Sequence, residues 1–385
     1  MTAQHDPLHS RFMPTQNTNP SLPLLIKSQA HLDEVCANLS GCAQVAVDTE
    51  FVRTNTYAPR LGLLQLTTPG MTVCIDPLAG MEMSPLWELL FEPQRTSIMH
   101  SAKQDLEVMW FERHEIIHNL VDTQLCAALL GYPAQIGYAG LLNELLGIEI
   151  GKTQTRTDWS RRPLSDAQLE YAAEDVVHLP EMLDILAERL HAVGRYDWAL
   201  EDSRALCQVE LYKPEPADAW QRLKAIPFMS PEQQTRARAL AAWREARAVA
   251  ADKPRGWILS DKALLQLATE NPNQTNQLQK IDDMPAAIIR KQGDKLLNVL
   301  AAANDSFARG DSEFTKEIVD IEREKSLSKR MTTLVKEEAE KLGIAAEVLA
   351  SKRDINAVIR GSADARVLNG WRRAVIGDKL LAATG

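Results

Sequence analysis

Strand-like patterns in this sequence are confined to its first third, and its second half carries only helical patterns. Short runs rich in Val, Ile and Leu occur at 44–51, 61–67, 71–76, 96–100 and 119–122. Thr68-Pro69-Gly70 is a tight connection between the second and third runs, which predicts a hairpin. Helical patterns separate the later runs. This order predicts an α/β domain with a mixed sheet, antiparallel at one side, followed by all-helical domains.

Helix start and stop signals support this division. Ser28 and Gly41 bracket the first predicted helix, and Ser165 with Gln168 forms a capping-box pattern at the start of a long helix that Pro180 should bend. Further helices are predicted in the first half at 103–113, 123–130 and 139–146, and in the second half at 230–251, 260–270, 285–300, 315–342 and 366–381.

Composition narrows the class of protein. The chain has 385 residues, 45% of them apolar and 25% charged, which is ordinary for a globular protein of two or three domains. No apolar stretch approaches the about 18 residues that a membrane span needs, and no secretory signal is apparent. The five cysteines show no metal-ligand spacing, so we expect reduced thiols in a cytoplasmic protein.

Charge is distributed unevenly along the chain. The net charge of −9 combines −14 over residues 1–210 with +5 over residues 211–385. An acidic first half suits a carboxylate site that holds cations, and a mildly basic second half suits contact with a polyanion, although a mixed solvated surface would show the same balance.

Two acidic residues interrupt the first predicted strand. Asp48 and Glu50 lie two positions apart, so their side chains point to the same face of an otherwise apolar strand. Burying two like charges is costly unless a divalent cation lies between them. The alternative is an edge strand whose outer face is in water.

Three further residues complete a candidate cluster. Asp105 lies near the start of the helix that follows the strand at 96–100, where Asp also occurs for its interaction with the helix dipole. Tyr171 and Asp175 are four residues apart on a predicted helix and therefore share one face.

Taken together, these residues resemble a known set of motifs. Val47-Asp-Thr-Glu-Phe51, His100-Ser-Ala-Lys-Gln-Asp-Leu106 and Tyr171-Ala-Ala-Glu-Asp-Val176 resemble the three motifs of the DEDD exonuclease superfamily, in the subclass with Tyr in the third motif. The resemblance covers about residues 23–205 and implies a ribonuclease-H-like fold.

The helical half resembles a second family. Trp220-Gln-Arg-Leu223, Trp243-Arg-Glu-Ala-Arg247 and Ser260-Asp-Lys-Ala-Leu-Leu265 resemble the helicase-and-RNase-D C-terminal (HRDC) domain. An exonuclease domain followed by such units resembles the bacterial ribonuclease D family. The domains expected are a disordered tail (1–22), an exonuclease domain (23–205), a linker (206–219), an HRDC domain (220–300) and a divergent second HRDC-like domain (301–385).

The resemblance implies hydrolysis of RNA from its 3′ end with two divalent ions, Mg²⁺ or Mn²⁺. Asp48, Glu50, Asp105 and Asp175 would hold the ions, and Tyr171 would orient the attacking water. The implied substrate is RNA with a single-stranded 3′ end, and tRNA precursors in particular. The implied product is a 5′-mononucleotide.

Other residues are candidates for substrate contact. His100 and Gln104 flank Asp105, while Lys152, Arg156 and Trp159 occupy a polar loop before the Ser165 helix, where cations and an indole would suit a phosphate and a base. In the helical half, four aromatic residues are expected to be core: Trp220, Phe228, Trp243 and Trp257.

Two alternatives stay open at this point. The motifs do not separate RNA from DNA, so a DNA exonuclease of proofreading or repair type is the first alternative. The second is a non-catalytic nucleic-acid-binding scaffold, which retention of all five candidate residues disfavours. We expect no membrane association and no obligatory protein partner.

Overall fold

The chain forms two compact units in a computed structural model that describes residues 23–151, 157–311 and 321–384. The first unit contains 23–52, 61–211 and 321–384 of the described residues, and the second contains 53–60 and 212–311. Each unit is therefore made of segments that are distant in the sequence. The predicted disordered tail, residues 1–22, lies outside the described residues.

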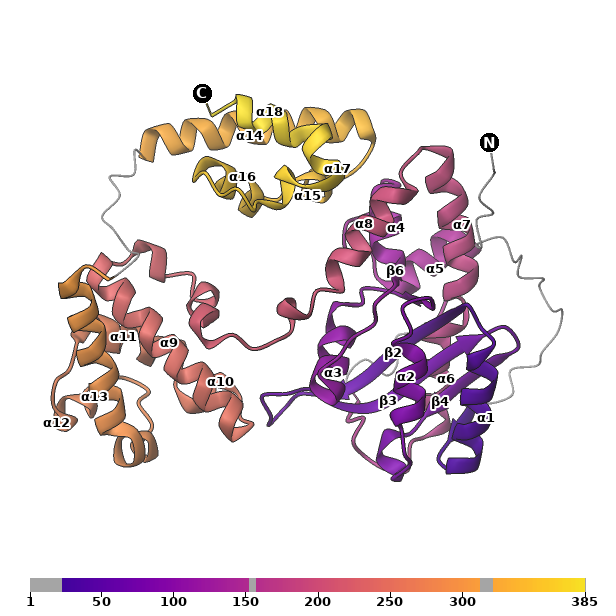
Figure 1. Cartoon of the computed structure of the whole chain (residues 1–385), viewed down its shortest axis with the longest axis horizontal. Coiled ribbons are helices and arrows are strands. Elements are labelled where there is room, and N and C mark those ends of the chain that lie inside the picture. Colours follow the sequence, from indigo (N-terminus) through magenta and orange to yellow (C-terminus); the bar gives the residue numbers. More distant parts are fainter. Residues whose placement is uncertain (1–22, 152–156, 312–320, 385) are drawn as a thin grey trace. The chain divides into compact units, whose positions relative to one another are not determined.

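The first unit is built on a six-stranded sheet in the order β1-β4-β3-β2-β5-β6. Figure 1 shows strands of this sheet as arrows in the N-terminal part of the chain. Its strands are β1 Leu24–Ile26, β2 Gln44–Val52, β3 Arg60–Thr68, β4 Met71–Ile75, β5 Thr96–Met99 and β6 Leu120–Asp122. β1 pairs parallel with β4, and β2-β5 and β5-β6 are parallel. β3 and β4 pair antiparallel, with Thr68 opposite Met71. The predicted mixed sheet and its hairpin are confirmed; β1 was not predicted, because three residues are too few to show alternation.

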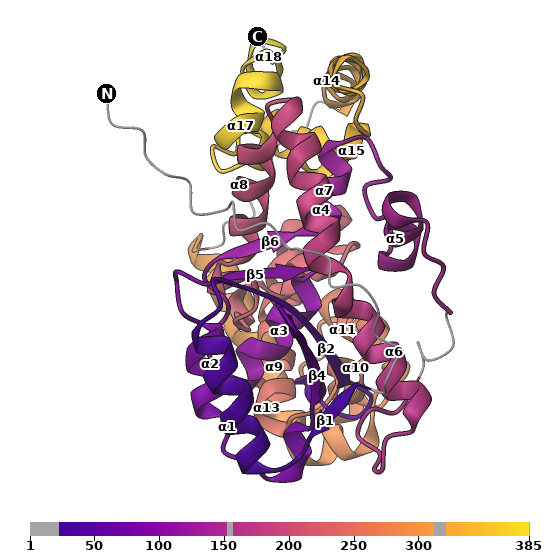
Figure 2. The same ribbon diagram turned by 90° about the vertical axis from the view of Figure 1, so that its right-hand side faces the viewer.

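Helices cover both faces of this sheet: α1 and α2 lie against one face and α6 against the other (Figure 2). The helices are α1 Gln29–Ser40, α2 Ser84–Leu90, α3 Lys103–Arg113, α4 Thr123–Leu129, α5 Tyr138–Leu146, α6 Asp166–Val177, α7 Leu179–Ala192 and α8 Tyr196–Leu206. The predicted bent helix is two helices that meet at His178, with Pro180 in the first turn of α7. This break fits Pro180, which has no N–H to bond to the Val176 carbonyl and whose ring would clash with that carbonyl in a continuous helix. Helices α2 and α8 were not predicted.

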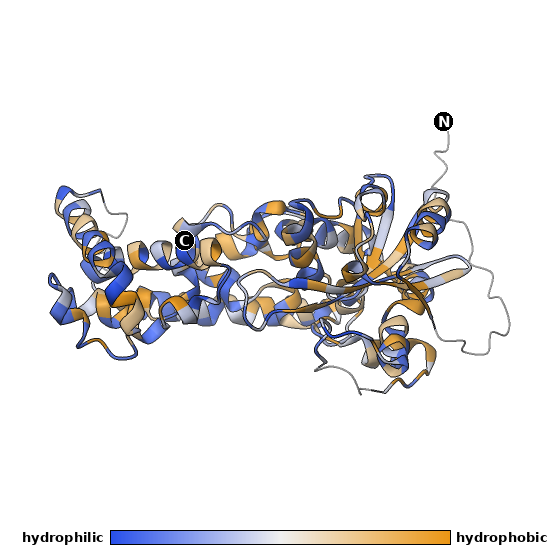
Figure 3. Cartoon of the chain, turned by 90° about the horizontal axis from the view of Figure 1, so that it is seen from below, coloured by the Kyte–Doolittle hydropathy of each residue, from blue (hydrophilic) through white to orange (hydrophobic). Residues whose placement is uncertain are grey.

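Apolar residues occur on the strands and in alternation with polar residues along the helices (Figure 3). Leu63, Leu64 and Leu66 of β3 are fully buried, so both faces of this strand are covered. Leu63 packs against Leu169 of α6 and against Trp159. This cluster holds α6 on the sheet.

The last helices of the chain belong to the first unit. They are α14 Ile321–Leu342, α15 Ala346–Leu349, α16 Lys352–Ile359, α17 Gly370–Arg372 and α18 Asp378–Ala382, with a π-helical segment at Arg373–Gly377 between the last two. The predicted helix at 366–381 is therefore interrupted. Trp371 of α17 stacks on Trp198 of α8, with ring centroids 4.3 Å apart and planes 4° from parallel.

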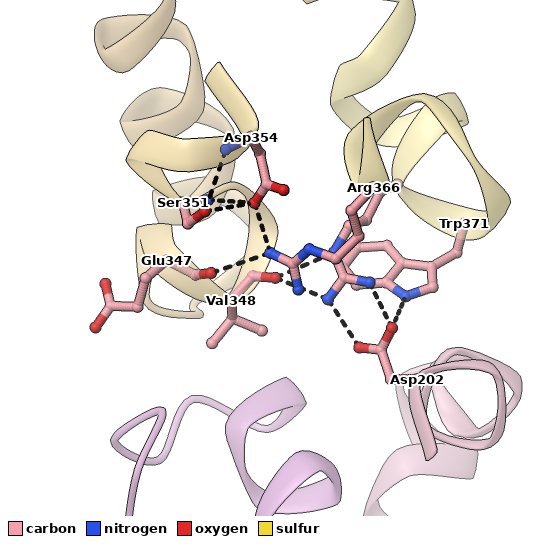
Figure 4. A network of polar contacts seen from close by, with 8 residues as sticks. Asp202, Glu347, Val348, Ser351, Asp354, Arg366 and Trp371 are labelled. Atoms are coloured by element: carbon pink, nitrogen blue, oxygen red, sulfur yellow. Dashed lines mark hydrogen bonds and ion pairs between the residues drawn. The ribbon is translucent and has the colours of Figure 1, made fainter. Parts of the chain in front are cut away.

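A buried ion pair reinforces this stack. Asp202 of α8 accepts hydrogen bonds from both terminal nitrogens of Arg372, whose residue exposure is 3%, and from the indole Nε1 of Trp371 at 3.2 Å (Figure 4). Arg372 also donates to the carbonyl oxygen of Val348 at 2.9 Å. Asp202 thus joins α8 to α17, and Arg372 in turn joins α17 to α15.

The second unit is helical. After 3₁₀ turns at Pro216–Arg222 and Ile226–Phe228 it contains α9 Pro231–Ala251, α10 Arg255–Ile258, α11 Asp261–Glu270, α12 Thr275–Leu278 and α13 Ala286–Arg309. Ser230 begins α9 with the predicted capping box, and Asp252 ends it in the left-handed conformation (φ 45°). α13 is longer than predicted. Within the described ranges, none of the helices is long and apolar enough to cross a membrane.

Two aromatic side chains of this unit differ from expectation. Trp220 and Trp243 pack against its core, as predicted. Phe228 is 91% exposed and Trp257 is 57% exposed, so the prediction that they are core is wrong. Phe228 ends the 3₁₀ turn Ile226–Phe228 and Trp257 lies within the short helix α10, and neither belongs to the α9–α11–α13 core.

Candidate functional site

The two acids of β2 lie on an interior strand. β2 is flanked by β3 and β5, so the edge-strand alternative is wrong. Carboxylate oxygens of Asp48, Glu50 and Asp175 lie within 4.8 Å of one another. The predicted juxtaposition of an acid from α6 with two acids from β2 is therefore present.

Helix α6 supplies two of the candidate residues from one face. Its start is fixed by the Ser165–Gln168 capping box, in which the Gln168 side chain accepts from the Ser165 amide at 2.9 Å. One turn apart, the Tyr171 side chain is hydrogen-bonded to Asp175. The phenol thus lies beside the carboxylates, as the spacing predicted.

Asp105 is held beside this group by β2 itself. It is 7% exposed, and its Oδ1 accepts from the Thr49 hydroxyl at 2.5 Å and from the Thr49 amide at 3.2 Å. The approach to α3 is fixed by Asp122, which accepts from the amides of Ser101 (3.0 Å) and Ala102 (2.9 Å). Ser101 has a left-handed backbone (φ 61°), which the two bonds to Asp122 stabilise.

The four carboxyl groups repel one another. Burial raises the pKa of Asp48 well above its usual range, and the charges of Asp105, Asp175 and Glu50 raise it further. Burial, followed by the neighbouring acids, raises the pKa of Glu50 to about 8. Burial also raises the pKa values of Asp105 and Asp175 to about 7. A cation at this point would relieve the repulsion.

The donor set fits a hard divalent cation. Mg²⁺ and Mn²⁺ take oxygen ligands, and one or two carboxylates plus water and substrate oxygens are a common set. Asp48, Glu50 and Asp175 offer three carboxylates at mutual distances that one ion can bridge, and Asp105 stands next to them. The site is therefore an acidic cluster suited to divalent metal.

The residues predicted to contact substrate differ in their exposure and in their hydrogen-bond partners. Both ring nitrogens of His100 have protein partners, the Thr123 hydroxyl at 2.8 Å and the Ile136 carbonyl at 3.0 Å, which favours a supporting role. Gln104 is exposed at the start of α3. Lys152 and Arg156 lie outside the described residues.

Trp159 requires a correction. Its side chain is only 3% exposed and packs in the core cluster with Leu63, leaving neither ring face open to a base. Its ring centroid lies 6.3 Å from that of Tyr171. Arg162 locks this loop by donating to the Trp159 carbonyl at 2.8 Å and to Asp76 at 2.6 Å. The structure favours packing beneath Tyr171 over the predicted base stacking.

Sequence reasoning missed three supporting residues. Thr49 could have been noticed because it lies between the two acids, and Asp122 because it precedes a helix as an N-cap. Tyr138 donates from its hydroxyl to the Glu174 carbonyl at 2.6 Å. Burial raises the pKa of Tyr138, and the negative charges of Asp175 and Asp48 raise it further. Nothing in the local sequence distinguishes Tyr138.

Comparison with known proteins agrees with this geometry. Residues 23–191 match the 3′-5′ exonuclease family, 233–300 the HRDC domain, and 324–380 the C-terminal HRDC domain of ribonuclease D. Ribonuclease D of Nitrobacter hamburgensis is 34% identical over 93% of this chain and 94% of its own length. Ribonuclease D of a Shewanella species is 33% identical over 94% of each.

A solved structure gives the same result. The crystal structure of Escherichia coli RNase D, an exoribonuclease involved in structured RNA processing, superposes with a TM-score of 0.83 at 28% identity, covering 94% of this chain and 98% of that one. The catalytic core of RRP6 from Trypanosoma brucei, 23% identical with a TM-score of 0.58 over 75% of this chain and 82% of its own, shares the fold. The predicted ribonuclease-H-like fold and 3′-5′ exoribonuclease class are confirmed. This chain belongs to the ribonuclease D family.

Proposed function

We propose that the chain shortens RNA from a single-stranded 3′ end by two-metal hydrolysis, and that tRNA precursors are among its substrates. The observation that carries this proposal is the meeting of Asp48, Glu50 and Asp175 within 4.8 Å, with Tyr171 bonded to Asp175. Bound Mg²⁺ or Mn²⁺ would lower the pKa of a water nucleophile and stabilise the leaving 3′ oxygen.

The protein groups divide the remaining work. Asp48, Glu50, Asp105 and Asp175 would hold the ions at the last phosphodiester. Burial and the nearby carboxylates raise the pKa of Tyr171 above its usual value, so its hydroxyl stays protonated at neutral pH. A protonated phenol orients the attacking water by hydrogen bonding and does not act as a general base.

Substrate contacts form the less direct part of the proposal. Lys152 and Arg156 stay candidates for phosphate contacts, and Gln104 for a contact near the 3′ end.

The proposed domain organisation is an exonuclease domain (23–205), a linker (206–219), an HRDC domain (220–300) and a second HRDC-like domain (301–385). The cysteines are free thiols, which suits the reducing cytoplasm.

An end-labelled oligonucleotide assay tests this function. The purified chain is incubated with 5′-labelled single-stranded RNA, matched DNA and a 3′-extended tRNA precursor, in Mg²⁺ or in EDTA. We expect a ladder of RNA products shortened from the 3′ end, 5′-mononucleotides as the released species, and no products in EDTA.

Two variants make the test specific. Asp48→Asn should abolish the ladder while leaving the circular dichroism spectrum unchanged. Tyr171→Phe should slow the ladder by about 100-fold, which is the cost of a misplaced reacting group. Full activity of Asp48→Asn, or equal degradation of DNA, would contradict the proposal.

A further inference from the structure

The strand next to the acidic strand β2 carries a buried amide without a partner. Gln65 lies in the middle of β3 and is fully buried. Within the part of the chain that the structure describes, neither its Nε2 nor its Oε1 has a hydrogen-bond partner. Burying an amide without hydrogen bonds destabilises a fold, because the amide loses its bonds to water. Gln65 therefore needs an explanation other than the stability of the metal-free fold.

The Gln65 side chain points toward helix α6. Its partner in the pairing of β3 with β4 is Cys74, and directly paired residues have their side chains on the same face of a sheet. Cys74 packs in one cluster with Leu169 of α6 and with Leu63, which lies two positions before Gln65 on β3. Because alternate residues of a strand share a face, the Gln65 amide lies in the layer between the sheet and α6.

The acids of β2 lie in the same layer. Ala46, before the acids, shares a core cluster with Val176 of α6, and Val52, after them, packs against the cluster of Leu63 and Leu169. Asp48 and Glu50 are the alternate positions between Ala46 and Val52. Their side chains therefore face α6, as Gln65 does.

The direction of the two strands brings Gln65 beside these acids. β2 and β3 are neighbours in the sheet, and residues 53–59 between them are too few for a parallel crossover, so the strands run antiparallel. Val52 and Leu63 pack in one cluster near this connection. The step from Leu63 to Gln65 along β3 therefore leads back along β2 from Val52 toward the two acids.

We propose that Gln65 is a positioning residue of the metal site, whose amide donates to the carboxylates of Asp48 and Glu50 when these hold a divalent cation. The inference rests on the proposed function, since it assumes that the acids bind metal. A hydrogen bond to an ionised carboxylate is stronger than one between neutral groups, so the amide gains its partner in the metal-bound state. Such a bond fixes the orientation of the ligands.

Metal binding by variants of the full chain tests this role. Gln65→Met removes the amide and keeps an unbranched side chain. Isothermal titration calorimetry with Mn²⁺ should give a Kd roughly 10- to 100-fold above that of the parent, the range typical of partners that orient metal ligands. The Tm in EDTA should be at least as high as that of the parent, because Met buries no amide. A purely structural role would lower the Tm and leave the Kd unchanged.

Ser97→Ala is the matched control. Ser97 of β5 is also fully buried, and its hydroxyl has no hydrogen-bond partner among the residues that the structure describes. It is paired with Val45, the neighbour of Ala46, and therefore lies on the face of the sheet away from α6. The variant loses a buried polar atom of the same kind and should keep the Kd of the parent for Mn²⁺.

Three results would overturn the role of Gln65. The first is an unchanged Kd for Gln65→Met, and the second is an equal increase in Kd for Gln65→Met and Ser97→Ala. The third is a Tm in EDTA below that of the parent for both Gln65→Met and Gln65→Leu, because the amide would then stabilise the metal-free fold itself.

The two proposals fail differently. An RNA ladder from the unmodified chain with an unchanged Kd for Gln65→Met overturns the positioning role alone. A raised Kd for Gln65→Met with no ladder from the unmodified chain supports the positioning role and overturns the proposed hydrolysis.

Discussion

Thr49 donates two hydrogen bonds to Asp105, one from its hydroxyl at 2.5 Å and one from its backbone amide at 3.2 Å. Thr49 lies between Asp48 and Glu50 on β2, so a single residue couples the acid of α3 to the strand that carries two of the other three acids. Both bonds lower the pKa of Asp105 against the larger effect of its burial, and so favour its ionised form.

Thr49→Val should therefore weaken metal binding without unfolding the chain. Loss of the hydroxyl removes one bond to a charged acceptor, which costs about 1.5–3 kcal/mol. Partners that orient metal ligands typically contribute 10–100-fold in metal affinity or activity. Activity is titrated with Mg²⁺ for Thr49→Val and for Thr49→Ser, which keeps the donor. Equal metal dependence in the two variants would count against this role.

Divalent metal should stabilise the first unit. The raised pKa values of the four acids show that their charges are unfavourable in the metal-free fold, and a ligand that binds only the folded state adds about 2.7 kcal/mol at 100 times its Kd. Calorimetry with Mg²⁺, Mn²⁺ or EDTA should show a higher Tm with metal. In Asp48→Asn the metal-free Tm should rise and the metal-induced shift should shrink; a shift as large as in the parent would exclude the cluster as its source.

The metal-free chain should lose stability as pH rises through neutrality. Unfolded Glu and Asp titrate near pH 4, whereas the folded pKa values are about 8 for Glu50 and about 7 for Asp105 and Asp175. A raised folded pKa means that the folded state binds the proton more tightly, so this contribution is complete below about pH 4 and is lost as pH rises to about 8.

Urea unfolding in EDTA at pH 5, 6, 7 and 8 measures this dependence. The free energy of unfolding should fall less steeply in Glu50→Gln, because the amide does not titrate. Parallel curves for the parent and Glu50→Gln would show that Glu50 is not responsible.

Asp202→Ala should release the C-terminal helices from α8. It leaves the buried Arg372 guanidinium without its carboxylate partner, and breaking a buried pair costs about 3–5 kcal/mol. Limited proteolysis should cut the chain faster within 321–384, and the Tm should fall. Arg373→Ala is the control, because the Arg373–Asp378 pair is exposed and is worth at most about 1 kcal/mol. Equal proteolysis rates would contradict the anchoring role.

Trp159→Ala should act through stability. A buried Trp replaced by Ala costs about 3–5 kcal/mol, because the cavity that it leaves against Leu63 and Leu169 cannot close fully. Thermal unfolding with and without RNA separates the two possibilities. A normal Tm with weakened RNA binding would restore base stacking as the role of Trp159.

Local sequence was enough for much of the fold and for the choice of site residues. Alternation predicted β2, the Pro-Gly connection predicted the β3–β4 hairpin, and Ser with Gln three residues later predicted the starts of α6 and α9. These signals depend on residues within one turn or one strand, so they can be read without the tertiary structure. The order of the three motifs identified the acids because the resemblance supplied long-range information.

The tertiary structure decided which side chains are buried and which residues support the acids. Trp159 is buried and Trp257 is exposed, although the sequence suggested the opposite for each. Burial depends on what packs from elsewhere in the chain, and Leu63 meets Trp159 from almost a hundred residues away. Only the packing of α3 on β2 shows that Thr49 bonds to Asp105, because a hydrogen bond between distant residues leaves no periodic trace in the sequence.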